Sequence, residues 1–290
     1  EFWQNYLNEL QRRNIPVYSV SSIFRKEQIF FRWYGKSYRK VLNTFTHLFV
    51  QDEASVQLLR TIGITNTTVV GDTRFDRVLE ICRQAKELPL VEKFKGNHTA
   101  FVAGSSWGPD EDIFIPYLNA HPEVKLIIAP HVIDESHLKE IIGKLNRTVV
   151  RYTQATEEKV KEADCLLIDC FGLLSSIYRY GEIAYIGGGF GVGIHNVLEA
   201  AVYGMPVIFG PNNKRFREAQ GLLQCKGGLE IQGAEDFKKI MDNFLNNYEA
   251  LDKAGKKAGN YVRDNAGALE KIMHTVTSVS YTHLTLPTIA

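Results

Sequence analysis

The sequence predicts an α/β protein built on parallel β-sheets, and three observations support this. From about residue 99 onward, short apolar runs alternate with helical patterns, which is typical of βαβ units. The same alternation appears in a shorter form before residue 90. A glycine-rich turn at 187–193 joins one apolar run to a helical pattern, an arrangement that ligand sites at the ends of parallel strands favour.

The apolar runs and helical patterns give the expected elements in order. The expected strands are 15–20, 47–50, 68–70, 99–103, 124–129, 165–168, 183–186 and 206–209. The expected helices are 3–13, 26–43, 53–61, 75–86, 109–119, 134–145, 172–180, 195–203, 215–222, 234–248 and 249–276. Residues 88–96 are interpreted as a linker.

This order predicts half of one α/β domain followed by one complete α/β domain. We expect a partial N-terminal domain over 1–90 and a C-terminal domain over 97–260, with a further helix over 261–278. The chain begins with Glu rather than Met, so it is expected to be cut from a longer protein. Residues 279–290 change abruptly in character and are interpreted as a non-native tail.

Composition excludes several classes of protein. The 290 residues are 44% hydrophobic and 23% charged, which is close to the globular average and argues against extensive disorder. Lys and Arg number 34 against 33 Asp and Glu, so a nucleic-acid partner is not expected. The four cysteines show no CxxC spacing and are expected to be reduced.

The segment Ile186–Ala201 carries the strongest signal for a ligand site. Its glycines allow the backbone close to a ligand, and the free N–H groups where a helix begins favour an anion such as phosphate. The glycine spacing does not fit GxGxxG, so a dinucleotide site is not supported. Asn196 and Glu199 are three residues apart and share a helical face, where a carboxylate suits the hydroxyls of a ribose. The alternative is a flexible loop with a capping Asn and a solvated Glu.

Three further loops follow expected strands at the same sheet edge. Ser105 and Ser106 could hold an anion, or could belong to an ordinary helix cap. His131 after Pro130 is a candidate ligand or a plain polar loop residue. The Asp169–Leu174 segment is a candidate site or a simple strand-to-helix turn. Together these loops strengthen the case for a site.

The first 45 residues combine positive charge with aromatic rings. Eight Lys and Arg residues stand against three Glu, an excess of +5, and aromatic residues interleave with them. Such a surface suits anionic lipid headgroups. A helix pair that packs on another part of the protein explains the pattern equally well. The candidate acceptor or membrane residues are Arg25, Lys26, Arg32, Trp33, Lys36, Arg39 and Lys40.

Several strings together resemble the 3-deoxy-D-manno-octulosonic acid (Kdo) transferases, glycosyltransferases that add Kdo to lipid A precursor. The opening EFWQN is similar to that family's E-[LF]-W-P-N, and GDTRFD at 71–76 is similar to its G-x-x-K-F-D. The block HNVLEAA at 195–201 matches the family's H-N-x-L-E-A-A, and PVIFGP at 206–211 matches its P-V-x-x-G-P. The resemblance covers residues 1 to about 278.

The resemblance implies a GT-B fold, in which two Rossmann-like domains face each other, with the N-terminal one incomplete here. It implies CMP-Kdo as donor without a metal or other cofactor, lipid A precursor as acceptor, and anchoring at the cytoplasmic face of the inner membrane, through a segment missing from this chain. The implied nucleotide-binding residues are Pro130, His131, Phe171, Gly172, Leu173, Asn196 and Glu199. The candidates for the donor sugar and phosphate are Ser105, Ser106, Gly188, Gly189 and His195.

Some positions depart from the family pattern. The family's P-R-H is Pro130-His131 here, without the arginine, and its S-T-H-x-G-E is the segment Ser105–Asp110. The family's general-base glutamate is expected upstream of Glu1, so this chain by itself is expected not to transfer Kdo. Two alternatives stay open: a non-catalytic nucleotide-sugar or lipid-binding module, and another GT-B enzyme that uses a UDP-sugar.

Overall fold

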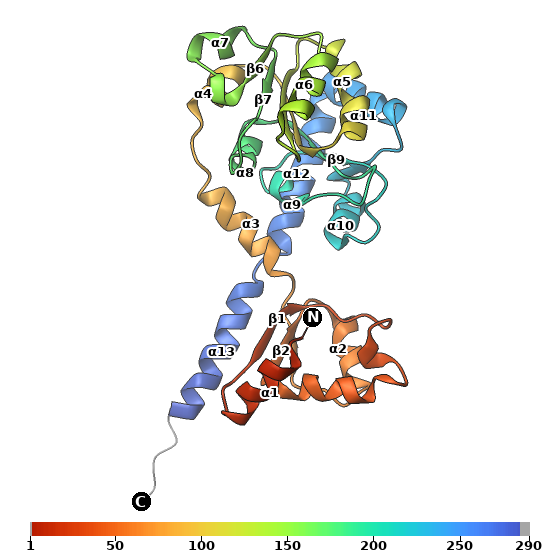
Figure 1. Cartoon of the computed structure of the whole chain (residues 1–290), viewed down its shortest axis with the longest axis vertical. Coiled ribbons are helices and arrows are strands. Elements are labelled where there is room, and N and C mark those ends of the chain that lie inside the picture. Colours follow the sequence, from red (N-terminus) through yellow and green to blue (C-terminus); the bar gives the residue numbers. More distant parts are fainter. Residues whose placement is uncertain (1, 285–290) are drawn as a thin grey trace, which may run out of the picture. The chain divides into compact units, whose positions relative to one another are not determined.

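The computed structural model describes residues 2–284, with side chains as far as Thr277 (Figure 1). The chain folds into two compact units, and the division falls at Arg77/Val78 and Asp264/Asn265. Unit 1 contains the described residues of 1–77 and 265–290, and unit 2 is Val78–Asp264. These bounds differ from the expected domains 1–90, 97–260 and 261–278, because residues 78–96 pack with unit 2.

Unit 1 is built on a three-stranded parallel sheet in the order β1-β2-β3. Its strands are β1 Tyr18–Ser22, β2 His47–Val50 and β3 Thr67–Val69. The other elements are α1 Gln4–Arg12, η1 Ile29–Phe31, η2 Gly35–Thr44, α2 Glu53–Arg60, the start of α3 Thr73–Arg83, and α13 Ala268–Leu284. Leu42, Leu48 and Leu59 are fully buried in its main core.

The start of α13 is fixed to unit 1 by a carboxylate. Asp76 accepts hydrogen bonds from the backbone N–H groups of Gly267 (2.8 Å) and Ala268 (3.1 Å). These are N–H groups of a helix start, which lack partners within the helix. Ala268 and Ile272 then pack against Phe49 and Val70. Asp76, the last residue of the GDTRFD string, therefore stabilises the start of α13.

Unit 2 is built on a seven-stranded, fully parallel sheet in the order β10-β9-β8-β4-β5-β7-β6. Its strands are β4 Ala100–Ser106, β5 Lys125–Pro130, β6 Val149–Arg151, β7 Cys165–Leu167, β8 Ile183–Ile186, β9 Val207–Phe209 and β10 Gly228–Glu230. Its helices are the rest of α3, α4 Pro89–Lys95, α5 Gly108–Asn119, α6 Glu135–Lys144, α7 Glu157–Glu162, α8 Leu174–Ile177, α9 Leu198–Ala201, α10 Arg217–Cys225, α11 Ala234–Asn246 and α12 Tyr248–Asp264, with short 3₁₀ turns η3 Tyr152–Gln154 and η4 Tyr178–Tyr180.

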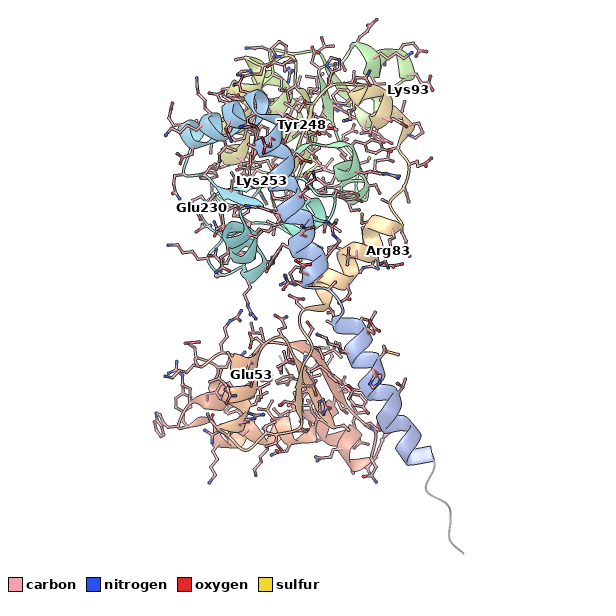
Figure 2. All side chains as sticks on the ribbon, turned by 180° about the vertical axis from the view of Figure 1, so that it is seen from behind. Glu53, Arg83, Lys93, Glu230, Tyr248 and Lys253 are labelled. Atoms are coloured by element: carbon pink, nitrogen blue, oxygen red, sulfur yellow. The ribbon has the colours of Figure 1, made fainter. Side chains whose placement is uncertain are left out.

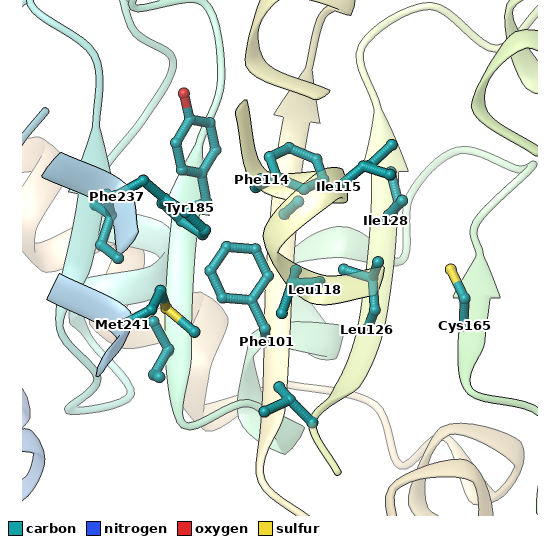
Figure 3. Packing of buried hydrophobic residues seen from close by; sticks show 14 of the residues in the cluster. Phe101, Phe114, Ile115, Leu118, Leu126, Ile128, Cys165, Tyr185, Phe237 and Met241 are labelled. Carbon is teal, nitrogen blue, oxygen red and sulfur yellow. The ribbon is translucent and has the colours of Figure 1, made fainter. Parts of the chain in front are cut away.

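One face of the seven-stranded sheet packs on helices through large apolar side chains. Figure 3 shows Phe101 on β4 and Tyr185 on β8 among Phe114 and Leu118 of α5 and Phe237 of α11. Phe101 contacts the edge of Phe237 with ring centroids 5.6 Å apart. Central strands buried in this way read as continuous apolar runs, which explains why they were predictable from the sequence.

Several elements differ from expectation. The expected linker at 88–96 contains helix α4: Pro89 lies in its first turn, and Val91 and Phe94 are buried. Lys93 of this helix, labelled in Figure 2, pairs with Glu157 of α7. The expected helix at 26–43 is instead the 3₁₀ segments η1 and η2, because the backbone of Arg32 is extended.

Other differences concern edges and breaks. Two short edge strands, β6 and β10, were not expected. The expected helix 249–276 is broken at Gly267, whose φ is +100°. Of the expected tail 279–290, residues up to Leu284 continue α13, and 285–290 lie outside the described residues. Within the described part of the chain, no helix has both the length and the apolar character to cross a membrane.

Candidate functional site in unit 2

The strand order of unit 2 creates a switch point, where the loops that follow two neighbouring strands lead in opposite directions. On one side of β4 the sheet continues through β5, β7 and β6, and on the other side it continues through β8, β9 and β10. Strands β4 and β8 are therefore neighbours whose following loops diverge. In open parallel sheets, ligands bind in the crevice at such a switch point, beyond the carboxyl ends of the strands. The candidate residues of unit 2 lie at the carboxyl ends of β4, β5, β7 and β8 or in the segments that follow these strands.

The loop after β4 is held by buried polar contacts. Ser105 has φ +53°, an uncommon conformation for a residue other than glycine. The hydroxyl of Ser106 donates to Glu111 Oε1 at 3.0 Å, and both side chains are fully buried. This hydroxyl is thus hydrogen-bonded within the protein, and the N-cap of α5 is Trp107 rather than Ser106.

Asp110 joins the loops on both sides of the switch point. Its Oδ2 accepts the backbone N–H groups of Trp107 and of Gly188, both at 2.9 Å. Its Oδ1 accepts the hydroxyl of Tyr185 at 2.8 Å. Asp110 is only 1% exposed. The Gly188 N–H, a candidate donor to phosphate, is therefore directed at a protein carboxylate.

The glycine-rich loop after β8 depends on the absence of side chains. A Cβ on Gly187 would lie 2.2 Å from the carbonyl oxygen of Ser105, and one on Gly189 would lie 2.5 Å from the nitrogen of Gly210. In addition, the backbone N–H of Asn212 donates a hydrogen bond to the carbonyl oxygen of Gly189. The close approach fixes the loop against β4 and against the end of β9.

Three aromatic rings stack where β4, β5 and β8 end. The His131 ring lies 4.6 Å from the Trp107 ring and 4.4 Å from the His195 ring, with interplanar angles of 28° and 25°. Trp107 Nε1 donates to His195 Nε2 at 3.3 Å. Burial lowers the pKa of His195 and neighbouring His131 lowers it further, while Asp110 acts in the opposite direction. His131 follows Pro130, the buried last residue of β5.

Asn196 and Glu199 lie together, as the sequence predicted. Asn196 Nδ2 donates to Glu199 Oε1 at 3.0 Å, and Asn196 Oδ1 accepts the N–H of Leu198. The expected helix 195–203 is shorter, because α9 spans only Leu198–Ala201. Asn196 thus holds one oxygen of the half-buried Glu199 carboxylate.

The loop after β7 combines one fixed residue with exposed ones. Asp169 accepts both the N–H (2.9 Å) and the hydroxyl (2.6 Å) of Thr153. Phe171 beyond it is 81% exposed, Gly172 has φ +83°, and Leu173 is half-buried. An exposed aromatic ring at this edge is available to pack on a flat ligand.

Sequence reasoning missed several residues of this edge. The sequence indicated Trp107 and Asp110 only as departures from the S-T-H-x-G-E pattern. In the structure, Trp107 bonds to His195 in the ring stack, and Asp110 links the segments that follow β4 and β8. A cavity of about 310 Å³ lies beyond β9 and β10, lined by Asn212, Lys214, Arg215 and Glu230 among others. Glu230, labelled in Figure 2, accepts from the buried Asn213 at 2.6 Å. No signal in the local sequence distinguishes these residues.

In unit 1, the candidate acceptor residues lie on and around η1 and η2. Trp33 is 90% exposed, and Arg25, Lys26, Arg32, Lys36 and Lys40 are exposed too. Arg39 is half-buried and donates to the carbonyl oxygens of Phe30 (2.8 Å) and Arg32 (3.3 Å). Phe30 and Phe31 are half-buried and pack against the unit 1 core.

Comparison with known sequences points to one family. The family described as "3-Deoxy-D-manno-octulosonic-acid transferase (kdotransferase)" matches residues 1–77. A 3-deoxy-D-manno-octulosonic acid transferase of Rickettsia bellii is 25% identical over 96% of this chain and 68% of its own length. The enzyme of that name from Haemophilus influenzae is 24% identical over 94% of this chain and 66% of its own. Against the Rickettsia typhi relative the chain spans 54% of the length.

Comparison with solved structures shows the fold. The C-terminal CMP-Kdo binding domain of WaaA from Acinetobacter baumannii aligns with a TM-score of 0.52 at 21% identity, over 65% of this chain and 97% of that one. A UDP-N-acetylglucosamine 2-epimerase from Listeria monocytogenes aligns with a TM-score of 0.60 at 14% identity, over 89% of this chain and 68% of that one. The GT-B-like α/β class is confirmed. Together with the sequence matches, these findings confirm that the chain is related to the Kdo transferase family of glycosyltransferases.

Proposed function

We propose that this chain is part of a glycosyltransferase that moves Kdo from CMP-Kdo to a lipid A precursor, and that unit 2 binds the donor. The observation that carries the proposal is the convergence of four loops at the switch point of the sheet, where Glu199 faces the edge with one oxygen held by Asn196. Its relatives are Kdo transferases, and the A. baumannii domain is a CMP-Kdo binding domain.

The loops offer complementary contacts for a cytidine nucleotide. A carboxylate such as Glu199 can accept hydrogen bonds from both ribose hydroxyls. Phe171 and Leu173 offer apolar surface for the base, on either side of Gly172, whose φ is +83°. We assign His131 and His195, which stack on each other, to the phosphate and the sugar together with Gly188 and Gly189; the His195 ring lies beside Gly188. Ser105 completes this group at the end of β4.

We further propose that η1 and η2 meet an anionic membrane surface at the cytoplasmic face of the inner membrane. The acyl chains of a lipid acceptor cannot leave the bilayer cheaply, since each CH₂ exposed to water costs about 0.8 kcal/mol. The exposed Lys36, Lys40 and Trp33 combine the charges and the ring that an interface of this kind attracts.

Calorimetry with CMP tests the donor assignment. Loss of a hydrogen-bond pair to a charged group costs about 1.5–3 kcal/mol, so Glu199→Ala should weaken CMP about tenfold or more. Glu249→Ala, an exposed glutamate on α12, is the matched control and should bind as the parent does. Unchanged CMP affinity in Glu199→Ala would remove the residue from the site, and preference for UMP over CMP would favour a UDP-sugar enzyme instead.

A further inference from the structure

The ring stack at the switch point contains a hydrogen bond that constrains the chemistry of His195. An indole N–H is a donor only. Trp107 Nε1 donates to His195 Nε2, so that nitrogen must be an acceptor and cannot carry a proton. In a neutral imidazole the single proton then resides on Nδ1.

The surroundings of His195 favour this neutral form. His131 stacks on its ring at 4.4 Å, and two cationic imidazoles at that distance would repel each other. Asp110 is the facing carboxylate, but its oxygens accept three hydrogen bonds from Trp107, Gly188 and Tyr185. Burial lowers the pKa of His195, His131 acts in the same direction, and Asp110 opposes both.

The other ring nitrogen of His195, Nδ1, can donate a hydrogen bond to a ligand. Among the side chains described, as far as Thr277, none forms a hydrogen bond with Nδ1 of His195, and the His195 side chain is half-buried beside Gly188. A neutral imidazole with its proton on Nδ1 is a directed single donor. It can contact an anionic oxygen without adding a full charge to the site.

We propose that Trp107 is a positioning residue, whose indole N–H fixes His195 in the Nδ1–H tautomer so that this N–H is presented to the anionic part of the nucleotide-sugar donor. The indole ring also stacks on His131, with ring centroids 4.6 Å apart, so Trp107 contacts both histidines. The part of this proposal that concerns the ligand rests on the proposed function, whereas the tautomer of the free protein does not.

NMR of the full chain with ¹⁵N-labelled histidine tests the tautomer directly. In the parent, His195 should show a protonated Nδ1, an unprotonated Nε2 and a titration below its ordinary value of 6.5. Trp107→Phe keeps a ring for stacking and removes the N–H, so Nε2–H should become populated and the pKa should rise. Trp33→Phe, in the other unit, is the control and should change neither. An unchanged His195 tautomer and pKa in Trp107→Phe would overturn the proposal.

Calorimetry with CMP tests the ligand contact. His195→Asn keeps an N–H donor near the δ position, whereas His195→Gln places its polar group near the ε position. We expect the Asn variant to bind CMP within about threefold of the parent and the Gln variant to lose about tenfold, the cost of one charge-assisted hydrogen bond. If Trp107→Phe leaves the two tautomers equally populated, its CMP affinity should fall about twofold.

The NMR and calorimetry experiments distinguish failure of the tautomer proposal from failure of the proposed donor site. If the parent chain binds no CMP but His195 shows the Nδ1–H tautomer, the proposed donor site is refuted. The conclusion that Trp107 fixes the tautomer of His195 is then still supported. Equal CMP affinity of the Asn and Gln variants, in a chain that binds CMP, would overturn the Nδ1–H contact. Near-ultraviolet circular dichroism of each variant confirms that the fold is retained before either result is interpreted.

Discussion

The two units hold their candidate residues in opposite ways. In unit 2 the loops are fixed by buried polar contacts: Asp110 accepts three hydrogen bonds at 1% exposure, and Ser106 bonds to the fully buried Glu111. In unit 1 most of the candidate cations are exposed on and around η1 and η2, and Trp33 is 90% exposed. The first arrangement suits a small ligand of fixed shape, and the second suits a broad, adaptable surface. Single substitutions should therefore act on stability in unit 2 and on association in unit 1.

The largest effect is expected at Asp110. Asp110→Ala leaves the N–H groups of Trp107 and Gly188 and the hydroxyl of Tyr185 without their acceptor, and each buried unsatisfied group costs about 1–3 kcal/mol. We expect the free energy of unfolding to fall by about 3 kcal/mol or more, measured by denaturant titration. Asp112→Ala on the same helix removes only an exposed pair with Lys144 and should change little. Similar losses in both variants would contradict the fixed-loop description.

The next effect tests the adaptable surface of unit 1. Lys36→Glu with Lys40→Glu should weaken binding to vesicles that contain anionic lipid by about 2 kcal/mol, since each cation near such a surface contributes about 1 kcal/mol. The loss should shrink at high salt, and CMP binding should be unaffected. Lys238→Glu with Lys239→Glu on α11 is the matched reversal in unit 2. Co-sedimentation that falls equally for both pairs would indicate a general charge effect.

A smaller effect is expected where α12 and α13 separate. Gly267 has φ +100°, and an added Cβ would meet nothing within 4 Å, so only backbone conformation opposes a side chain there. Gly267→Ala should cost about 1 kcal/mol of unfolding free energy. Gly143→Ala inside α6 also has open space around the added Cβ, and it should be neutral or slightly stabilising. Equal effects at both positions would show that the left-handed conformation is not required.

The smallest effect concerns pH. His137 offers Nδ1 to the carbonyl oxygen of Val132 at 3.0 Å and Nε2 to Glu111 Oε2 at 3.1 Å. Because both nitrogens face acceptors, one proton must be shared between His137 and Glu111. Burial lowers the pKa of His137, but the Val132 carbonyl and the Glu111 carboxylate outweigh it and raise the pKa above 6.5.

The sign of the pH dependence follows from that raised pKa. The stabilisation is complete below the ordinary value of 6.5 and is lost as pH rises through the higher folded pKa. Burial raises the pKa of Glu111 despite the opposing effect of His137, which gives the same direction. Denaturant titrations between pH 6 and 8 should show stability falling with pH in the parent and less so in His137→Gln. A rise with pH attributable to this pair would refute the shared proton.

Most of the fold was predictable because the central strands of unit 2 are buried runs, such as the segments of β4 and β5. The elements that were missed lie at edges or depend on distant contacts. Strand β6 is only half-buried, and β10 is three residues long and begins with a glycine. Helix α4 is short, and its buried side chains Val91 and Phe94 depend on contacts within unit 2 that the local sequence does not reveal. Local composition carries too little information in these segments.

The candidate site was likewise predictable only in part, because many of its contacts join residues from different elements. Convergence of the loops could be predicted, because the ends of parallel strands meet at one edge. Engagement of Ser106 with Glu111 and of Gly188 with Asp110 could not, since the partners belong to different elements. The contact of Trp107 with His195 joins residues 88 positions apart. The predicted ligand roles of Asn196, Glu199 and the others stay predictions.

The strand order of unit 2 also has a consequence for the time course of folding. Strand β4 lies in the middle of the sheet, yet its partner β8 follows about 80 residues later, whereas β4 and β5 are close in the chain. Loop closure over such a distance is entropically costly and slows folding. During synthesis, β4 to β7 can associate first, and one edge of β4 stays open until β8 emerges. That exposed edge of a very apolar strand is the point at which the nascent chain most needs protection from aggregation.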